Sequence, residues 1–236
     1  MTAQDDARET EMRNRFNLEK AGGRHDIDAF LELGGASVPE HLRGTKVEFE
    51  LKSTTKGKPD ISTVRDFGLH YIQKWSRLHW LFGIYDANQK LVYCLYGPPT
   101  KMKPWFDEKA AYIRADVELG KHVPKLITDA TLTAILGPEA DFGKQQARSL
   151  MKNQFKAGAY AAAADLPGER FSRKAMLELL RLRCGYVIGR GSTLNNPHIP
   201  ASYFDGWEKI TKEHASRLRE LVVEELSKQA AVRGTP

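Results

Sequence analysis

Apolar and polar positions alternate most regularly over residues 46–55, KVEFELKSTT, and this period of two predicts a β-strand. Its apolar face would hold Val47, Phe49 and Leu51. Its polar face would hold Glu48, Glu50 and Lys52, an unusual set for one side of a strand. Residues 26–33, DIDAFLEL, alternate in the same way and predict a second strand shortly before it.

The rest of the first hundred residues predicts an α/β arrangement. Residues 5–20 have a helix-forming composition and are followed by two glycines, a typical helix stop. Apolar spacing predicts a further helix over residues 61–75. Two more strands are expected over residues 79–86 and 90–97, joined by a short turn. This order of elements suits a mixed central sheet flanked by helices.

After residue 98 the pattern becomes mainly helical. Helices are predicted over residues 104–120, 125–136, 141–164, 172–184 and 205–231. Residues 185–204 are rich in Gly, Pro, Asn and Ser, which predicts a loop. We therefore expect an α/β core over residues 1–100 and a helical part over residues 101–236 that completes it in one compact unit.

The charge is unevenly distributed along the chain. The whole sequence has 36 Lys+Arg against 30 Asp+Glu, a net charge of +6. Residues 1–118 hold 18 of each sign, whereas residues 119–236 hold 18 basic and 12 acidic side chains. Within residues 142–200 the ratio is ten to three, which is typical of a surface that meets a polyanion.

Several classes of protein are not expected. No apolar run approaches the roughly 18 residues that a membrane helix needs, and the charged N-terminal segment does not resemble a signal peptide, so we expect a cytoplasmic protein without a membrane partner. The sequence contains no phosphate-binding loop of the Walker type, so no nucleotide cofactor is expected.

The polar faces of the first two strands suggest a site for a hard cation. If the strands pair, Asp28 at the start of one can meet Glu50 on the other. Two carboxylates and a backbone carbonyl form an oxygen-ligand site that suits Mg²⁺. Lys52 beside them would stabilise charge on a phosphate or help to deprotonate a water. The alternative is an edge strand with an ordinary ion pair, worth at most ~1 kcal/mol.

This constellation resembles the PD-(D/E)XK nuclease superfamily, and within it the type II restriction endonucleases, over roughly residues 10–97. The resemblance implies a restriction-endonuclease-like sheet, with Asp28 and Glu50 as Mg²⁺ ligands and Lys52 as a catalytic residue. Ile27 stands where the family name has proline, which leaves Asp26 as a rival for Asp28. Members often add an acid from the first helix; the candidates for that role are Glu11 and Glu19.

A second nuclease signature is weaker. Gly83-Ile84-Tyr85, followed ten residues later by Tyr96-Gly97, superficially resembles the GIY-YIG nucleases. The second element lacks the residue expected between tyrosine and glycine, and a hairpin of two core strands explains the same residues.

DNA contacts are expected mainly from the basic second half. Basic residues recur every four positions as a stripe on the helix predicted from residue 141: Lys144, Arg148, Lys152 and Lys156. The next helix adds Arg173. Side chains able to read bases lie in the predicted loop: Arg190, Ser192, Thr193, Asn195 and Asn196. Lys56 and Lys58 follow the candidate catalytic strand.

The sequence therefore predicts a Mg²⁺-dependent endonuclease that cuts double-stranded DNA at a short specific site, as a homodimer whose twofold symmetry matches a palindrome. Two alternatives stay open. One is a repair or mobile-element nuclease of the same fold, and the other is a non-catalytic, sequence-specific DNA-binding regulator.

Overall fold

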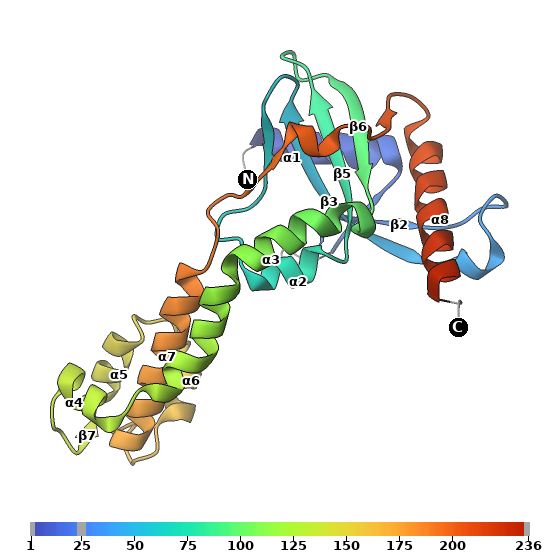
Figure 1. Cartoon of the computed structure of the whole chain (residues 1–236). Helices are drawn as coiled ribbons and strands as arrows, with labels where there is room; N and C mark the ends of the chain where they lie inside the picture. The colour runs from blue at the N-terminus through green and yellow to red at the C-terminus, as the bar shows by residue number, and fades with distance from the viewer. Residues whose placement is uncertain (1–2, 23–26, 234–236) are drawn as a thin grey trace. The chain divides into compact units, whose positions relative to one another are not determined.

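The computed structural model describes residues 3–22 and 27–233, and it divides the chain into two compact units (Figure 1). Unit 1 comprises residues 1–110 and 195–236, and unit 2 comprises residues 111–194. The C-terminal residues thus return to the unit that contains the central sheet.

Unit 1 is built on a mixed sheet of six strands in the order β1-β2-β3-β5-β6-β10. The strands are β1 Glu19–Lys20, β2 Ala29–Glu32, β3 Lys46–Thr55, β5 His79–Tyr85, β6 Leu91–Gly97 and β10 Lys209–Ile210. Only β3 and β5 run parallel; every other pair is antiparallel. The α/β class and the mixed central sheet expected from the sequence are confirmed.

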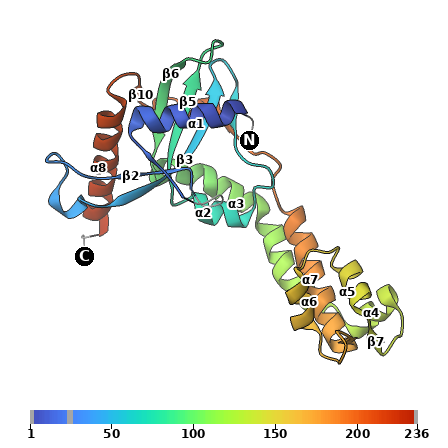
Figure 2. The same cartoon turned by 180° about the vertical axis from the view of Figure 1, so that it is seen from behind.

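Helices cover both faces of this sheet. Helices α1 (Ala3–Phe16) and α8 (His214–Arg233) contact each other and bury Met12, Phe16 and Leu218 against one face. Figures 1 and 2 show α1 crossing that face. The other face meets α2 (Leu69–Trp75) and the first half of α3 (Pro99–His122) through a cluster of aromatic rings.

The alternation in β3 produces the expected division of its side chains. Phe49 and Leu51 are almost fully buried in the core shared with α1. A close approach on the same face explains one glycine: a Cβ at Gly83 of β5 would lie 2.7 Å from the Met12 sulfur. Gly83 thus belongs to the β5/β6 hairpin of core strands, the simpler interpretation of this segment.

Unit 2 is mainly helical and has its own core. It contains the second half of α3 and, after it, η2 Val123–Leu126, α4 Asp129–Leu136, β7 Asp141–Phe142, α5 Lys144–Leu150, α6 Ala157–Ala163, β8 Phe171–Ser172 and α7 Arg173–Gly191. Its buried cluster includes Phe142, Tyr160 and Phe171.

Several predicted elements differ in extent from those of the structure. Residues 61–75 are not one helix, because Ile61 lies in strand β4 (Asp60–Ser62), which pairs with β9 (His198–Pro200). Residues 185–204 are not all loop, because α7 continues to Gly191. The last helix begins at His214 rather than 205, because β10 first adds to the sheet edge.

The two remaining short elements of unit 1 are η1 (Glu40–Leu42) and η3 (Ala201–Phe204). In the part of the chain that the structure describes, no helix combines the length and the apolar character needed to cross a lipid bilayer.

Candidate active site at strands β2 and β3

The pairing of β2 with β3 brings Asp28 and Glu50 together. The antiparallel register joins Ala29 to Phe49, so the next position places Asp28 opposite Glu50. The Asp28 amide donates to the Phe49 carbonyl at 3.1 Å. The Asp28 carboxylate accepts a hydrogen bond from the Leu51 amide at 2.8 Å, and so continues the ladder beyond the last paired residue. The register thus sets the two acids at facing positions of neighbouring strands, and the charge of Asp28 acts on Glu50.

Lys52 completes the cluster from the same face of β3. Its ammonium donates to the Glu50 carboxylate at 2.5 Å. The side chain of Glu50 is only 4% exposed and that of Lys52 18%. The Lys52 nitrogen also lies 5.2 Å from the centre of the Trp75 ring on α2. The Trp75 ring shields the ion pair from water and holds the Lys52 ammonium in place.

Burial sets the electrostatics of the pair. Desolvation raises the pKa of the Glu50 carboxyl from its usual 4.5 to about 7, although the Lys52 charge opposes the rise. The negative charge of Asp28 adds to the rise. Burial disfavours the Lys52 ammonium, but the Glu50 and Asp28 carboxylates outweigh this effect and raise its pKa. The lysine therefore stays charged, and the cluster still carries a surplus of negative charge.

A third acid, Glu9 on α1, borders this cluster. Its side chain is 18% exposed and pairs with Arg13 at 3.5 Å. Burial, followed by the negative charge of Asp28, raises the pKa of Glu9, and the Lys52 charge acts against it. Sequence reasoning missed Glu9. The available signal was its spacing, because Glu9 lies three residues before Met12 and seven before Phe16, on the buried face of the helix.

The two candidates that the sequence offered for this role, Glu11 and Glu19, lie elsewhere. Glu11 pairs with Arg15 at 2.8 Å on α1, and its charge acts on Tyr85 and Cys94. Glu19 is an exposed residue of β1. Asp26, the rival of Asp28, lies outside the described residues.

The donors present fit a hard divalent cation. Glu9, Asp28 and Glu50 offer carboxylate oxygens, which Mg²⁺ prefers. The Leu51 amide points toward Asp28, and in a strand the carbonyl of the same residue points to the same side. Burial raises the pKa values of Glu9 and Glu50 although each carboxyl has a cationic partner, Arg13 or Lys52, so a further positive charge at this place would favour their ionised forms. No three His, Cys, Asp or Glu side chains among residues 3–22 and 27–233 gather as a ready-made metal cage.

The basic stripe expected on the helix from residue 141 is not formed. That segment is two helices, α5 and α6, because Lys152 and Asn153 adopt positive φ angles of 51° and 56°. Lys144 is paired with Glu169, and Arg148 donates to Asn153 at 3.1 Å. The four-residue spacing therefore does not align these side chains on one helix face, and Lys156 stands at the N-cap position of α6 without a side-chain capping bond.

Arg173 links α7 to the segments around Asp129 and Glu139 within unit 2. Its guanidinium binds the Asp129 carboxylate at 2.9 Å through two nitrogens, and the Glu139 carbonyl at 2.7 Å. These bonds use most of the donors that a DNA contact would need.

The residues expected to read bases are split between the units. Arg190 lies in the last turn of α7 rather than in a loop. The hydroxyls of Ser192 and Thr193 donate to the helix-end carbonyls of residues 189 and 190, at 2.7 and 2.8 Å. Asn195 and Asn196 are exposed in unit 1, just before β9.

Lys56 and Lys58 are exposed in the turn after β3. At the usual rise of a strand, Lys56 lies roughly 20 Å along the chain from Glu50. The two lysines are thus at the far end of the strand from the carboxylate cluster.

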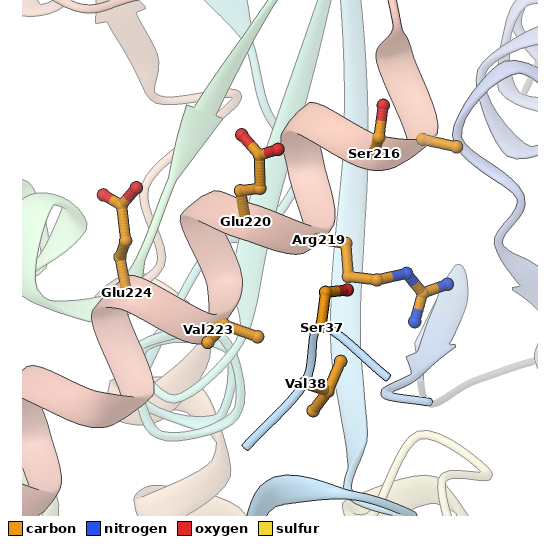
Figure 3. Close-up of a pocket in the computed structure, with 8 residues that line it drawn as sticks. Ser37, Val38, Ser216, Arg219, Glu220, Val223 and Glu224 are labelled. Atoms are coloured by element: carbon orange, nitrogen blue, oxygen red, sulfur yellow. The ribbon is translucent and has the colours of Figure 1, made fainter. Parts of the chain in front are cut away.

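Two hollows of unit 1 differ in chemistry. The first runs along α8 and is lined by aliphatic and charged side chains, among them Val38, Val223 and Glu224 (Figure 3). Its Arg219 donates to the Glu32 carbonyl at 2.8 Å and so ties α8 to β2. The second lies beside α2 and is lined by Ile27, Glu48, His70, Gln73, Lys74 and Arg77.

A scan against protein-family models and a search of curated proteins found no match for this chain. The geometry of the carboxylate cluster therefore carries the functional assignment.

Proposed function

We propose that unit 1 is a Mg²⁺-dependent nuclease centre that hydrolyses phosphodiester bonds of double-stranded DNA. One observation carries the proposal: the strand register sets Asp28 opposite Glu50, and Lys52 binds that glutamate from the same face. Three buried or half-buried charged groups on one sheet face are costly unless they serve a purpose.

The chain's own residues suggest a division of roles. Glu9, Asp28 and Glu50 would hold the cation, together with the Leu51 carbonyl. When bound, Mg²⁺ supplies a more acidic water and neutralises charge on the phosphate. Lys52 stays protonated beside the Glu50 carboxylate and is positioned to donate to a phosphate oxygen as negative charge develops there. The Trp75 ring and the sheet keep bulk water away from this pair.

The finer assignment is a type II restriction endonuclease that cuts a short specific site. Support comes from the order of elements in unit 1: a helix with an acid on its buried face, an antiparallel pair carrying the other two acids, and a helix that leads into a parallel strand. This order is the one that the resemblance to the PD-(D/E)XK nucleases implies. A homodimer acting on a palindrome belongs to the same proposal.

Plasmid cleavage tests the proposal directly. We expect purified protein with Mg²⁺ to cut plasmid DNA into discrete fragments, and Asp28→Asn, Glu50→Gln and Lys52→Met each to slow cleavage by about 100-fold or more. Glu32→Gln is the matched control, because Glu32 is an exposed acid at the far end of β2 from Asp28 and pairs only loosely with Lys46, at 3.8 Å.

The outcomes separate the alternatives. Cleavage that Glu50→Gln leaves unchanged would reject the site. Structure-dependent nicking without discrete fragments would indicate a repair or mobile-element nuclease of the same fold. Sequence-specific retardation of DNA on a gel, with no cleavage in any divalent metal, would indicate a non-catalytic regulator.

A further inference from the structure

The hollow beside α2 opens next to the carboxylate cluster. Its volume is about 510 Å³, and all six lining residues belong to unit 1. Ile27 directly precedes Asp28 in the chain, and Glu48 lies two residues before Glu50 on the same face of β3, about 7 Å away along the strand. The Lys74 charge acts on the Glu50 carboxylate. The hollow and the candidate active site are therefore neighbours.

The lining of this hollow suits an anion. His70, Gln73, Lys74 and Arg77 line it from α2 and the turn that follows, at spacings that place them on one side of the helix. Lys74 and Arg77 bring two positive charges and His70 and Gln73 further hydrogen-bond donors. Glu48 is the carboxylate among these six residues. His70, Gln73 and Arg77 are exposed, so a large ligand can reach them.

A nucleic acid backbone needs such an anchor here. The cluster of Glu9, Asp28 and Glu50 against Lys52 carries more negative than positive charge, so by itself it repels a polyanion. Positive groups beside it offset that repulsion and hold the backbone in register, while the reacting phosphate lies at the cluster. Lys74 and Arg77 supply this positive charge from the adjacent hollow.

We propose that this hollow, through His70, Gln73, Lys74 and Arg77, binds a DNA phosphate adjacent to the phosphate at which the strand is cut. This inference rests on the proposed nuclease function and adds a backbone-docking site in unit 1. The site is distinct from Lys144, Arg173 and the other positions expected from the sequence in unit 2. Because it contacts phosphate only, it contributes affinity without base preference.

Two variants of opposite sign test the site. Duplex binding is measured by fluorescence anisotropy in EDTA, at several salt concentrations, so that no cleavage occurs. We expect Arg77→Ala to weaken binding about eightfold at 0.1 M salt. The slope of the logarithm of the binding constant against the logarithm of the salt concentration should become shallower by about 0.9, the effect of one phosphate contact. Glu48→Gln removes a repulsive charge from the same hollow and should tighten binding several-fold.

Lys90→Ala is the matched control. Lys90 is an exposed cation of unit 1 in the turn between β5 and β6, outside the hollow. The Lys90→Ala substitution removes one positive charge, as Arg77→Ala does, and should change the affinity for duplex DNA less than twofold.

The results distinguish the two proposals. If Arg77→Ala and Lys90→Ala behave alike while the wild-type protein cleaves DNA, the docking site is rejected and the nuclease stands. If Arg77→Ala lowers affinity and salt dependence but no cleavage occurs with Mg²⁺, the docking site stands and the nuclease is rejected. A wild-type protein that binds no duplex in EDTA overturns the docking site, and one that also fails to cleave DNA with Mg²⁺ overturns both proposals.

Discussion

The buried Glu50 carboxyl should cost the protein stability at neutral and alkaline pH. A rise in its pKa from 4.5 to about 7 corresponds to a penalty on the order of 3 kcal/mol for the ionised form in the folded state. Between these two pH values the Glu50 carboxyl holds more of its proton in the folded state than in the unfolded state. The contribution of Glu50 to the free energy of unfolding should therefore be highest below pH 4.5, fall as the pH rises toward 7, and stay low above it.

Glu50→Gln isolates this effect, because glutamine has the shape of the protonated acid and can still accept a hydrogen bond from Lys52. The difference in unfolding free energy between the variant and the wild type should be about 3 kcal/mol more favourable to the variant at pH 8.5 than at pH 4. Urea unfolding followed by tryptophan fluorescence measures it. The signal reports unit 1 alone, since the four tryptophans of the chain all lie there: Trp75, Trp80, Trp105 and Trp207.

Mg²⁺ supplies a second arm of the same experiment. At pH 8.5 the cation should stabilise the wild type in proportion to its binding, because it compensates the ionised carboxylate, and should stabilise Glu50→Gln much less. A stability difference between variant and wild type that is equal at both pH values would contradict a raised pKa of Glu50.

Other variants test the remaining contacts. Glu9→Gln should lower Mg²⁺-dependent cleavage about 10- to 100-fold, whereas Glu11→Gln on the same helix should leave it within twofold; equal effects would remove Glu9 from the site. Gly83→Ala should lower the unfolding free energy of unit 1 by about 1–3 kcal/mol in urea, because its Cβ would overlap a sulfur of α1; an unchanged midpoint would contradict the close packing. Arg173→Ala should speed limited proteolysis of unit 2 by releasing Asp129, with DNA affinity unchanged; a selective loss of affinity would instead make it a DNA contact.

The sequence by itself determined the central part of the sheet and the core of the candidate site. Alternation of side chains is a local property of a strand, so KVEFELKSTT was sufficient to place Glu50 and Lys52 on one face and Phe49 and Leu51 on the other. The same pattern in DIDAFLEL indicated the antiparallel neighbour, and the register follows once the apolar faces of both strands enter one core.

Only the tertiary structure decided which other charged residues join that site. The spacing from Met12 and Phe16 favours Glu9 over Glu11 for the buried side of α1, but only the packing of α1 on the sheet brings Glu9 close enough for the charge of Asp28 to act on it. In unit 2, the four-residue spacing predicted a stripe of basic side chains, but the turn at Lys152 and Asn153 interrupts the helix that would carry it. Arg173 is held by Asp129, which lies 44 residues away in the chain. Such partners are set by long-range contacts, and the local pattern of polar and apolar positions does not encode them.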